Sequence, residues 1–156
     1  MKKILSIIIL FLSTTTLSAN DRDVELDKLF LELKKNIPSL SSGIAQQIWM
    51  LWSTHPTDQK LTSILDEGSR LVQDQQLKRA INVFTQAIEL DPNWAEAWNK
   101  RATVFYMIGE FQKSQNDIDK VLELEERHFG ALAGQGMVNI KLKNYDKAKR
   151  SYQKAQ

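Results

Sequence analysis

The chain has 156 residues, no cysteine and two histidines, and it carries 21 basic and 19 acidic side chains. This length suits a single domain, and without cysteine the chain has no disulfide, no thiol chemistry and no cysteine to carry a lipid. The two surplus positive charges are Lys2 and Lys3, so residues 20–156 are neutral overall, which argues against a nucleic-acid-binding protein.

Residues 1–19 have the pattern of a secretory signal peptide. Two lysines precede a short apolar run, Ile4 to Leu12, and the small residues Ser18 and Ala19 close the segment. The run has about nine residues, whereas a membrane-spanning helix needs roughly twenty, which favours cleavage after Ala19 over an uncleaved anchor. We therefore expect an exported protein, periplasmic in a Gram-negative bacterium or secreted, with no membrane span once the signal is removed.

Residues 20–60 should form a helical hairpin. Apolar residues recur every three or four positions on either side of a break at Pro38 to Gly43, as in two amphipathic helices. The hairpin could be a degenerate repeat that caps the following domain, or a separate docking element that uses its two tryptophans. The apolar positions are Leu26, Leu29, Phe30 and Leu33 in the first helix, and Ile44, Ile48, Trp49 and Trp52 in the second.

Residues 61–156 repeat with a period of 34. Gly68, Ala102 and Gly136 form one column of small residues, and large residues fill the neighbouring columns. Small residues let two helices approach closely, and large residues fill the space beside them. The pattern predicts one helical hairpin repeated at 61–94, 95–128 and, incompletely, 129–156. The large columns are Ile64, Trp98 and Leu132, and Leu77, Phe111 and Tyr145.

Turn residues fall between the predicted helices. Asp91-Pro92-Asn93 should end one helix and begin the next, because proline is tolerated only in a first turn and the flanking side chains can cap. Gly109 should supply a left-handed turn within the second repeat. The equivalent turns in the first and third repeats lack glycine, at 74–76 and 143–144.

The second repeat resembles the tetratricopeptide repeat family. Its residues fall where that family has Trp, a small residue, Tyr, Gly, Tyr, Phe and Ala, and the resemblance covers 61–156. It implies an all-α solenoid of antiparallel helix hairpins wound into a right-handed superhelix, which binds proteins and is not an enzyme. The matching residues are Trp98, Ala102, Phe105, Gly109, Phe111, Ile118 and Val121, with Ala80, Phe84, Ala87 and Pro92 in the first repeat.

By this resemblance, the first helix of each repeat lines a concave groove that holds a partner. The predicted groove surface is mostly uncharged, which favours an apolar helix or extended segment of another protein. Alternatively, the chain's own N-terminal hairpin fills much of the groove. The predicted groove residues are Leu65, Ser69, Val72 and Gln73 in the first repeat, Glu96, Asn99, Thr103, Tyr106 and Met107 in the second, and Ala133, Met137, Ile140 and Lys141 in the third.

Some members of the family grip a peptide's C-terminal carboxylate with lysine, asparagine and arginine. The matching positions here contain a single cation, Lys100, so we do not expect that mode. They are Leu65, Ser69, Lys100, Gly130 and Gly134.

No catalytic or metal-binding constellation is present in the sequence. His55 and His128 lie in different elements, and neither has a second ligand at metal-binding spacing. We therefore expect no catalytic residue, no cofactor and no metal.

A polar column interrupts the apolar pattern at Arg101. A period of 34 aligns it with Glu67 in the first repeat and Gln135 in the third. A partly buried arginine needs a partner. The sequence predicts a contact between Arg101 and Glu67 that fixes the stacking register, with Asp117 as the second candidate.

Residues 129–156 carry a net charge of +5, and those before them, from residue 20, carry −5. Part of the positive charge lies on the outer side of the last helix, at Lys147, Lys149, Arg150 and Lys154. This face could be a solubilising cap, or a contact for an acidic partner, anionic lipid or a second copy. We therefore expect an exported adaptor that holds another envelope protein; the alternative is a structural protein that self-associates or attaches to a membrane surface through this helix.

Overall fold

A computed structural model describes residues 19–155, and this part of the chain is entirely helical and loop, without strands. The predicted all-α fold is confirmed. None of the described helices is long and apolar enough to cross a membrane. The predicted signal peptide lies outside the described residues except for Ala19. The helices are α1 (Ala19–Leu33), α2 (Pro38–Ser53), α3 (Gln59–Gln73), α4 (Leu77–Leu90), α5 (Ala95–Met107), α6 (Phe111–Leu124), α7 (Phe129–Lys141) and α8 (Tyr145–Lys154).

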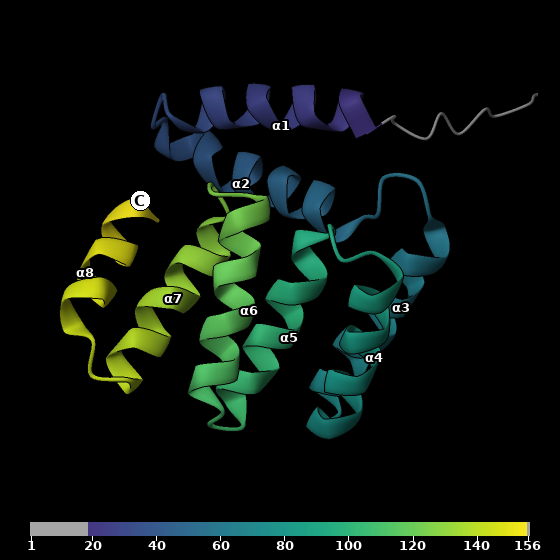
Figure 1. Ribbon diagram of the computed structural model, residues 1–156. Helices are drawn as coiled ribbons and strands as arrows, with labels where there is room; N and C mark the ends of the chain where they lie inside the picture. Colours follow the sequence, from purple (N-terminus) through teal and green to yellow (C-terminus); the bar gives the residue numbers. More distant parts are fainter. Residues whose placement is uncertain (1–18, 156) are drawn as a thin grey trace, which may run out of the picture.

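Three hairpins, α3–α4, α5–α6 and α7–α8, stack side by side (Figure 1). Small residues allow the two helices of a hairpin to pack closely. A Cβ added at Gly68 would lie 2.3 Å from the Phe84 ring, and one at Gly136 would lie 2.6 Å from the Tyr152 ring. Both contacts are shorter than carbon atoms tolerate, so packing requires glycine at Gly68 and Gly136.

The three intra-hairpin turns share one geometry. Gln75, Gly109 and Lys143 are spaced 34 residues apart and all have positive φ, at 59°, 82° and 63°. In each turn, the residue that follows the one with positive φ donates its backbone N–H to the carbonyl five residues before it, as Glu110 does to Phe105 at 2.9 Å. These helix ends have the left-handed C-terminal motif that glycine favours, and two of the three adopt it without glycine.

The core follows the stack. One buried cluster joins α3 and α4 to α5, and a second joins α5, α6 and α7. Trp98 borders both clusters. The largest fully buried side chain is Phe84, at the centre of the first cluster.

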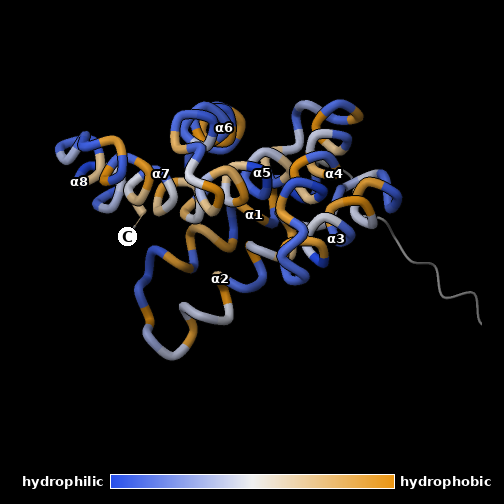
Figure 2. The backbone as a smooth tube through the Cα atoms, turned by 90° about the horizontal axis from the view of Figure 1, so that it is seen from below, coloured by the Kyte–Doolittle hydropathy of each residue, from blue (hydrophilic) through white to orange (hydrophobic). Residues whose placement is uncertain are grey.

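The α1–α2 hairpin crosses the stack instead of extending it. In Figure 1 both helices run across the upper ends of the upright helices, and Figure 2 shows α2 on the side of α5 and α7 that faces away from α6. A third cluster joins Ile48 and Trp52 of the hairpin to Phe129 at the start of α7. The two tryptophans of this hairpin dock on the chain's own repeats, a placement that differs from a cap stacked in line with them.

Candidate partner-binding groove

Helices α5 and α7 form the centre of the predicted groove, and the N-terminal hairpin covers their first turns. Trp52 is 2 % exposed and stacks on His128, with ring centroids 4.0 Å apart and planes within 9°. Its backbone carbonyl accepts a hydrogen bond of 2.9 Å from the Trp94 indole. Trp49 packs against the first turn of α7, where a Cβ on Gly130 would lie 2.6 Å from its ring. The groove is therefore divided into a covered half and an open half.

A buried polar network lies beneath the hairpin in the covered half. The Glu96 carboxylate and the His128 ring are both inaccessible to solvent, and His128 Nε2 lies 3.0 Å from Glu96 Oε2. His128 Nδ1 accepts the Ala131 backbone N–H, so the proton lies on Nε2 and is donated to Glu96. Asn99 donates to the same carboxylate oxygen, and Lys100 Nζ lies 3.3 Å from the other oxygen as an ion pair without hydrogen-bond geometry.

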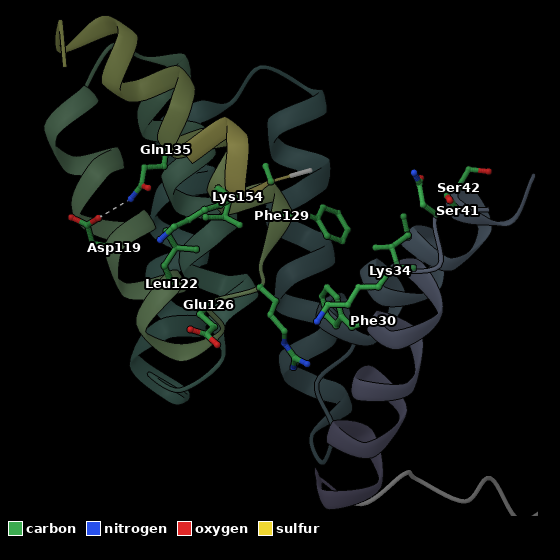
Figure 3. A pocket seen from close by; sticks show the side chains of 16 residues that line it. Phe30, Lys34, Ser41, Ser42, Asp119, Leu122, Glu126, Phe129, Gln135 and Lys154 are labelled. Carbon is green, nitrogen blue, oxygen red and sulfur yellow. Dashed lines mark hydrogen bonds between the residues drawn. The ribbon is translucent and has the colours of Figure 1, made fainter. Parts of the chain in front are cut away.

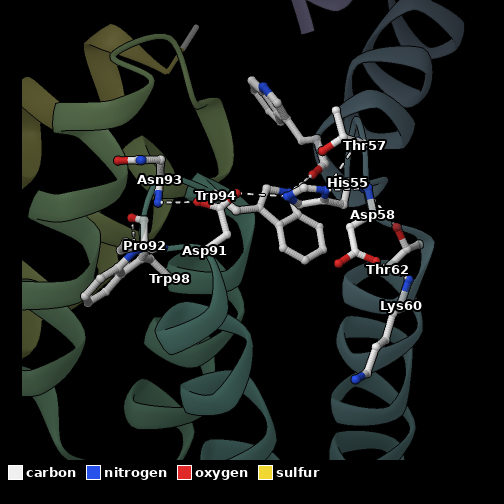
Figure 4. Close-up of polar contacts among 11 residues, drawn as sticks. His55, Thr57, Asp58, Lys60, Thr62, Asp91, Pro92, Asn93, Trp94 and Trp98 are labelled. Atoms are coloured by element: carbon white, nitrogen blue, oxygen red, sulfur yellow. Dashed lines mark hydrogen bonds and ion pairs between the residues drawn. The ribbon is translucent and has the colours of Figure 1, made fainter. Parts of the chain in front are cut away.

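The second histidine plays the same role at another junction (Figure 4). His55 Nδ1 accepts the backbone N–H groups of Thr57 and Asp58, and Nε2 lies 2.9 Å from Asp91 Oδ2. The ring also meets Trp94 edge-on, with centroids 5.1 Å apart. Both histidines therefore use their ring nitrogens to join loops to helices, which is a structural role.

An ion-pair cluster fastens α1 to the α6–α7 junction. Arg127 donates to Glu125 and Asp27, at 2.8 Å and 2.6 Å, and its guanidinium lies 4.5 Å from the Phe30 ring centroid. Burial alone would raise the pKa of Glu125, but hydrogen bonds from Arg127 outweigh this effect, so the pKa lies below its ordinary value. The Glu125 hydrogen bond in turn raises the pKa of Arg127.

The open half of the groove presents apolar side chains to solvent. Met107, Met137 and Ile140 are 44 %, 42 % and 45 % exposed, and Tyr106 is half-buried beside them. A notch of about 80 Å³ lies between α5 and α7 where the two halves meet, with Asn99 and Gly130 lining it on the covered side and Thr103 and Met137 on the open side. The notch exists because Gly134 has no side chain to fill it, and a Cβ there would meet only Ile118, at 3.5 Å.

Three predicted groove residues are enclosed by the chain itself. Leu65 is 1 % exposed in the first core cluster, and Glu96 and Asn99 are 1 % and 8 % exposed beneath the hairpin. Their side chains are used in folding and are not free to contact a partner. Among the other predicted positions, Gln73, Thr103 and Lys141 are exposed, and Ser69, Val72 and Ala133 are half-buried.

Arg101 pairs with Asp117 and not with Glu67, so the preferred contact of the sequence analysis is wrong. Its guanidinium makes two hydrogen bonds of 2.8 Å to the Asp117 carboxylate and one of 3.0 Å to Thr85 on the preceding hairpin. Both partners lie 16 positions from Arg101. The position 16 residues after Glu67 is Val83, which has no polar atom to offer, and Glu67 is exposed.

The same offset recurs one repeat later. Gln135 donates to Asp119 at 3.2 Å and accepts from Ser151 at 2.8 Å, and these partners also lie 16 positions away. Each polar side chain therefore joins the second helix of its own hairpin to that of the preceding one. The second candidate, Asp117, is the true partner of Arg101, and the polar column does link neighbouring repeats.

Two glycines of the groove were not recognised as groove-shaping from sequence. Gly130 admits Trp49 of the hairpin, and Gly134 leaves the notch open. Two glycines four residues apart inside a helix are the signal that could have indicated both. Glycine lowers the stability of a helix, so its presence suggests that the missing side chain leaves room for something else. Lys149, Arg150 and Lys154 of α8 lie on an exposed face, and their role stays a prediction. Lys147 does not share this outer face, because it is half-buried and its Nζ lies 3.8 Å from Asp119 of α6.

Comparison with known proteins supports one family. Two family models match the chain, described as TPR repeat over residues 68–109 and as tetratricopeptide repeat over residues 130–156. A TPR repeat-containing protein of Rhizobium etli is 34% identical over 114 residues, which cover 72% of this chain and 55% of that protein. Hsp70-Hsp90 organizing protein 3 of Arabidopsis thaliana is 26% identical over 88 residues, 56% of this chain and 16% of that protein. The chain thus spans about half of the first relative and a small part of the second.

Solved structures share the fold. The second TPR of Spaghetti bound to an HSP90 peptide superimposes with a TM-score of 0.61 at 23% identity, covering 62% of this chain and 90% of that one. The crystal structure of MamA superimposes with a TM-score of 0.59 at 18% identity, covering 87% of each chain.

Proposed function

Because the chain belongs to the tetratricopeptide repeat family, whose members mediate protein–protein interactions, we propose that it is an exported, non-catalytic adaptor that holds an apolar segment of another envelope protein. The segment lies in the open half of the groove. The observation that carries this proposal is the exposure of Met107, Met137 and Ile140 on α5 and α7, together with the notch at Gly134 that Met137 lines. The signal-peptide pattern of residues 1–19 supports export.

The contacts in the covered half argue against the carboxylate-gripping mode for this chain. Lys100, the single cation at the matching positions, is paired with Glu96. Gly130 is covered by Trp49. A peptide carboxylate would find neither a free cation nor space there. An apolar side chain entering the notch, with neighbouring residues on the two methionines, fits the open half better.

The test compares two glycine variants. Gly134→Leu fills the notch, whereas Gly43→Leu places the same side chain on α2 where nothing lies within 4 Å. Purified protein and both variants are used to capture partners from a periplasmic extract, and the affinity of each captured partner is then measured. We expect at least one partner to bind wild type and Gly43→Leu equally and Gly134→Leu at least tenfold more weakly. If all partners bind Gly134→Leu as well as wild type, the groove is not the binding site.

A further inference from the structure

A second cleft lies at the C-terminal end of the stack, between the α1–α2 hairpin on one side and α6, α7 and the end of α8 on the other (Figure 3). Its volume is about 1050 Å³. It is separate from the open half of the groove, and no residue lines both. Its apolar walls come from α1, α2, α6 and α7, at Phe30, Leu33, Ala45, Leu122, Phe129 and Leu132.

The cleft occupies the place where the next helix of the row α3, α5, α7 would begin. Helix α2 contacts α5 and the first turn of α7, with Trp49 on Gly130 of α7. Ser42, which lines the cleft, lies seven residues from Trp49, or about 10 Å along the α2 axis at 1.5 Å per residue. Packed helices lie roughly 8–10 Å apart, so a helix beside α7 would begin under Ser42.

The size of the cleft fits a short piece of helix. A helix about 10–12 Å across with a pitch of 5.4 Å occupies roughly 400–600 Å³ per turn. The cleft therefore has room for about two turns. A stack of helical hairpins is stabilised by each neighbour it gains, and within the described chain α8 is the last helix of this stack.

The charges around the cleft favour an acidic helix. Arg127 is occupied by Glu125 and Asp27. Within the described residues, Lys34 and Lys154 line the cleft without an ion-pair partner, against one unpaired carboxylate, Glu126 (Figure 3). Counted over the residues that line the cleft, three basic side chains stand against two acidic ones, a surplus of one positive charge, and it adds to the net positive charge of residues 129–156.

We propose that this cleft binds a short amphipathic helix from another protein. Its apolar stripe packs on Phe30, Phe129 and Leu132, and acidic side chains beside the stripe pair with Lys34 and Lys154. The bound helix then lies beside α7 as the next member of the row α3, α5, α7. The site is independent of the open half of the groove, so the protein has two separate places for partners.

The experiment selects binders from a displayed library of helix-forming peptides with the full chain as target. Enriched peptides are then measured against Ser42→Trp, which fills the cleft, and against the double variant Lys34→Glu/Lys154→Glu. The matched controls are Ser39→Trp, on the same helix outside the cleft, and Lys60→Glu/Lys149→Glu, which reverses two exposed lysines elsewhere. Met137→Asp reports separately on the open half of the groove.

We expect enriched peptides with apolar residues three and four apart and Asp or Glu beside them. They should bind Ser42→Trp and Lys34→Glu/Lys154→Glu at least tenfold more weakly, and bind the two controls and Met137→Asp as wild type does. The proposal is overturned if no peptide is enriched, if the peptides are basic, or if Ser42→Trp binds them normally. It is also overturned if Ser42→Trp instead abolishes binding to phosphatidylglycerol vesicles or self-association, which would assign the cleft to lipid or to a second copy.

Discussion

The two halves of the groove are built from the same helices and serve different purposes. In the covered half, Glu96 and His128 are buried beneath Trp52 and stabilise the chain's own hairpin. In the open half, about two and a half to three turns further along α5 and α7, Met107 and Met137 remain exposed. The difference teaches that one groove can be shared: a helix of the same chain occupies one half, and the other half stays free for a partner protein.

The largest expected effect comes from removing the ring that closes the covered half. Trp52→Ala should lower the free energy of unfolding by about 3–5 kcal/mol, because a nearly inaccessible indole stacked on His128 leaves a cavity. Urea denaturation measures the change. Trp52→Phe is the matched control, with an expected loss of about 1 kcal/mol, because the Trp52 indole N–H has no acceptor within the described chain. In the open half, Met107→Ala should change stability by less than about 0.5 kcal/mol. Similar losses for Trp52→Ala and Met107→Ala would remove the distinction between the halves.

A pair of glycines on α7 sharpens the comparison, because the same substitution should have opposite signs four residues apart. Gly130→Ala should destabilise the protein by about 1–3 kcal/mol, since the new Cβ would lie 2.6 Å from the Trp49 ring. Gly134→Ala should stabilise it by about 0.5–1 kcal/mol, because the nearest atom is 3.5 Å away and alanine favours the helix. Thermal or urea unfolding distinguishes the two. Two changes of the same sign would show that Trp49 does not occupy the space above Gly130.

In the turns of the second and third hairpins, removing a glycine and adding one should change the free energy of unfolding in opposite directions. Gly109→Ala should cost about 1 kcal/mol, because alanine is strained at a φ of 82°. Lys143→Gly should gain up to about 1 kcal/mol, because lysine already adopts a φ of 63° at the equivalent place. Both changes are measured by urea unfolding. They should leave the α1–α2 hairpin docked, as judged by near-UV circular dichroism. A destabilised Lys143→Gly would contradict the shared turn geometry.

The smallest expected effect is on the loss of stability at acid pH. Because the pKa of Glu125 is lowered in the folded chain, its stabilisation is complete above its ordinary pKa of about 4.5 and is lost as the pH falls from there through the lowered value. The free energy of unfolding of wild type should therefore fall more between pH 6 and pH 3 than that of Glu125→Gln, which has no charge to lose. Parallel curves for the two proteins would show that the Glu125–Arg127 pair does not help to hold the hairpin.

The sequence predicts the repeats well because their signals are local and periodic. Gly68 and Gly136 mark the close helix contacts, and Gly109 has the positive φ expected of it. The equivalent turns at Gln75 and Lys143 are harder to predict from residue type, yet the period of 34 places them.

The position of the hairpin could not be predicted from the same signals. Its apolar stripe indicates burial but not the surface on which it packs. The contact of Trp52 with His128 joins residues 76 positions apart in the chain. For that reason the burial of Glu96 and Asn99, and the division of the groove, appear only in three dimensions.

The tryptophans give the protein a built-in optical reporter. Of the four in the chain, Trp49, Trp52 and Trp94 lie where the hairpin meets the repeats, and none lies in the open half of the groove. The intrinsic emission spectrum should therefore follow release of the hairpin, while far-UV ellipticity follows the helices as a whole. If partner binding in the open half loosens the hairpin, the emission will shift to longer wavelength without loss of helix, and no dye or label is needed to see it.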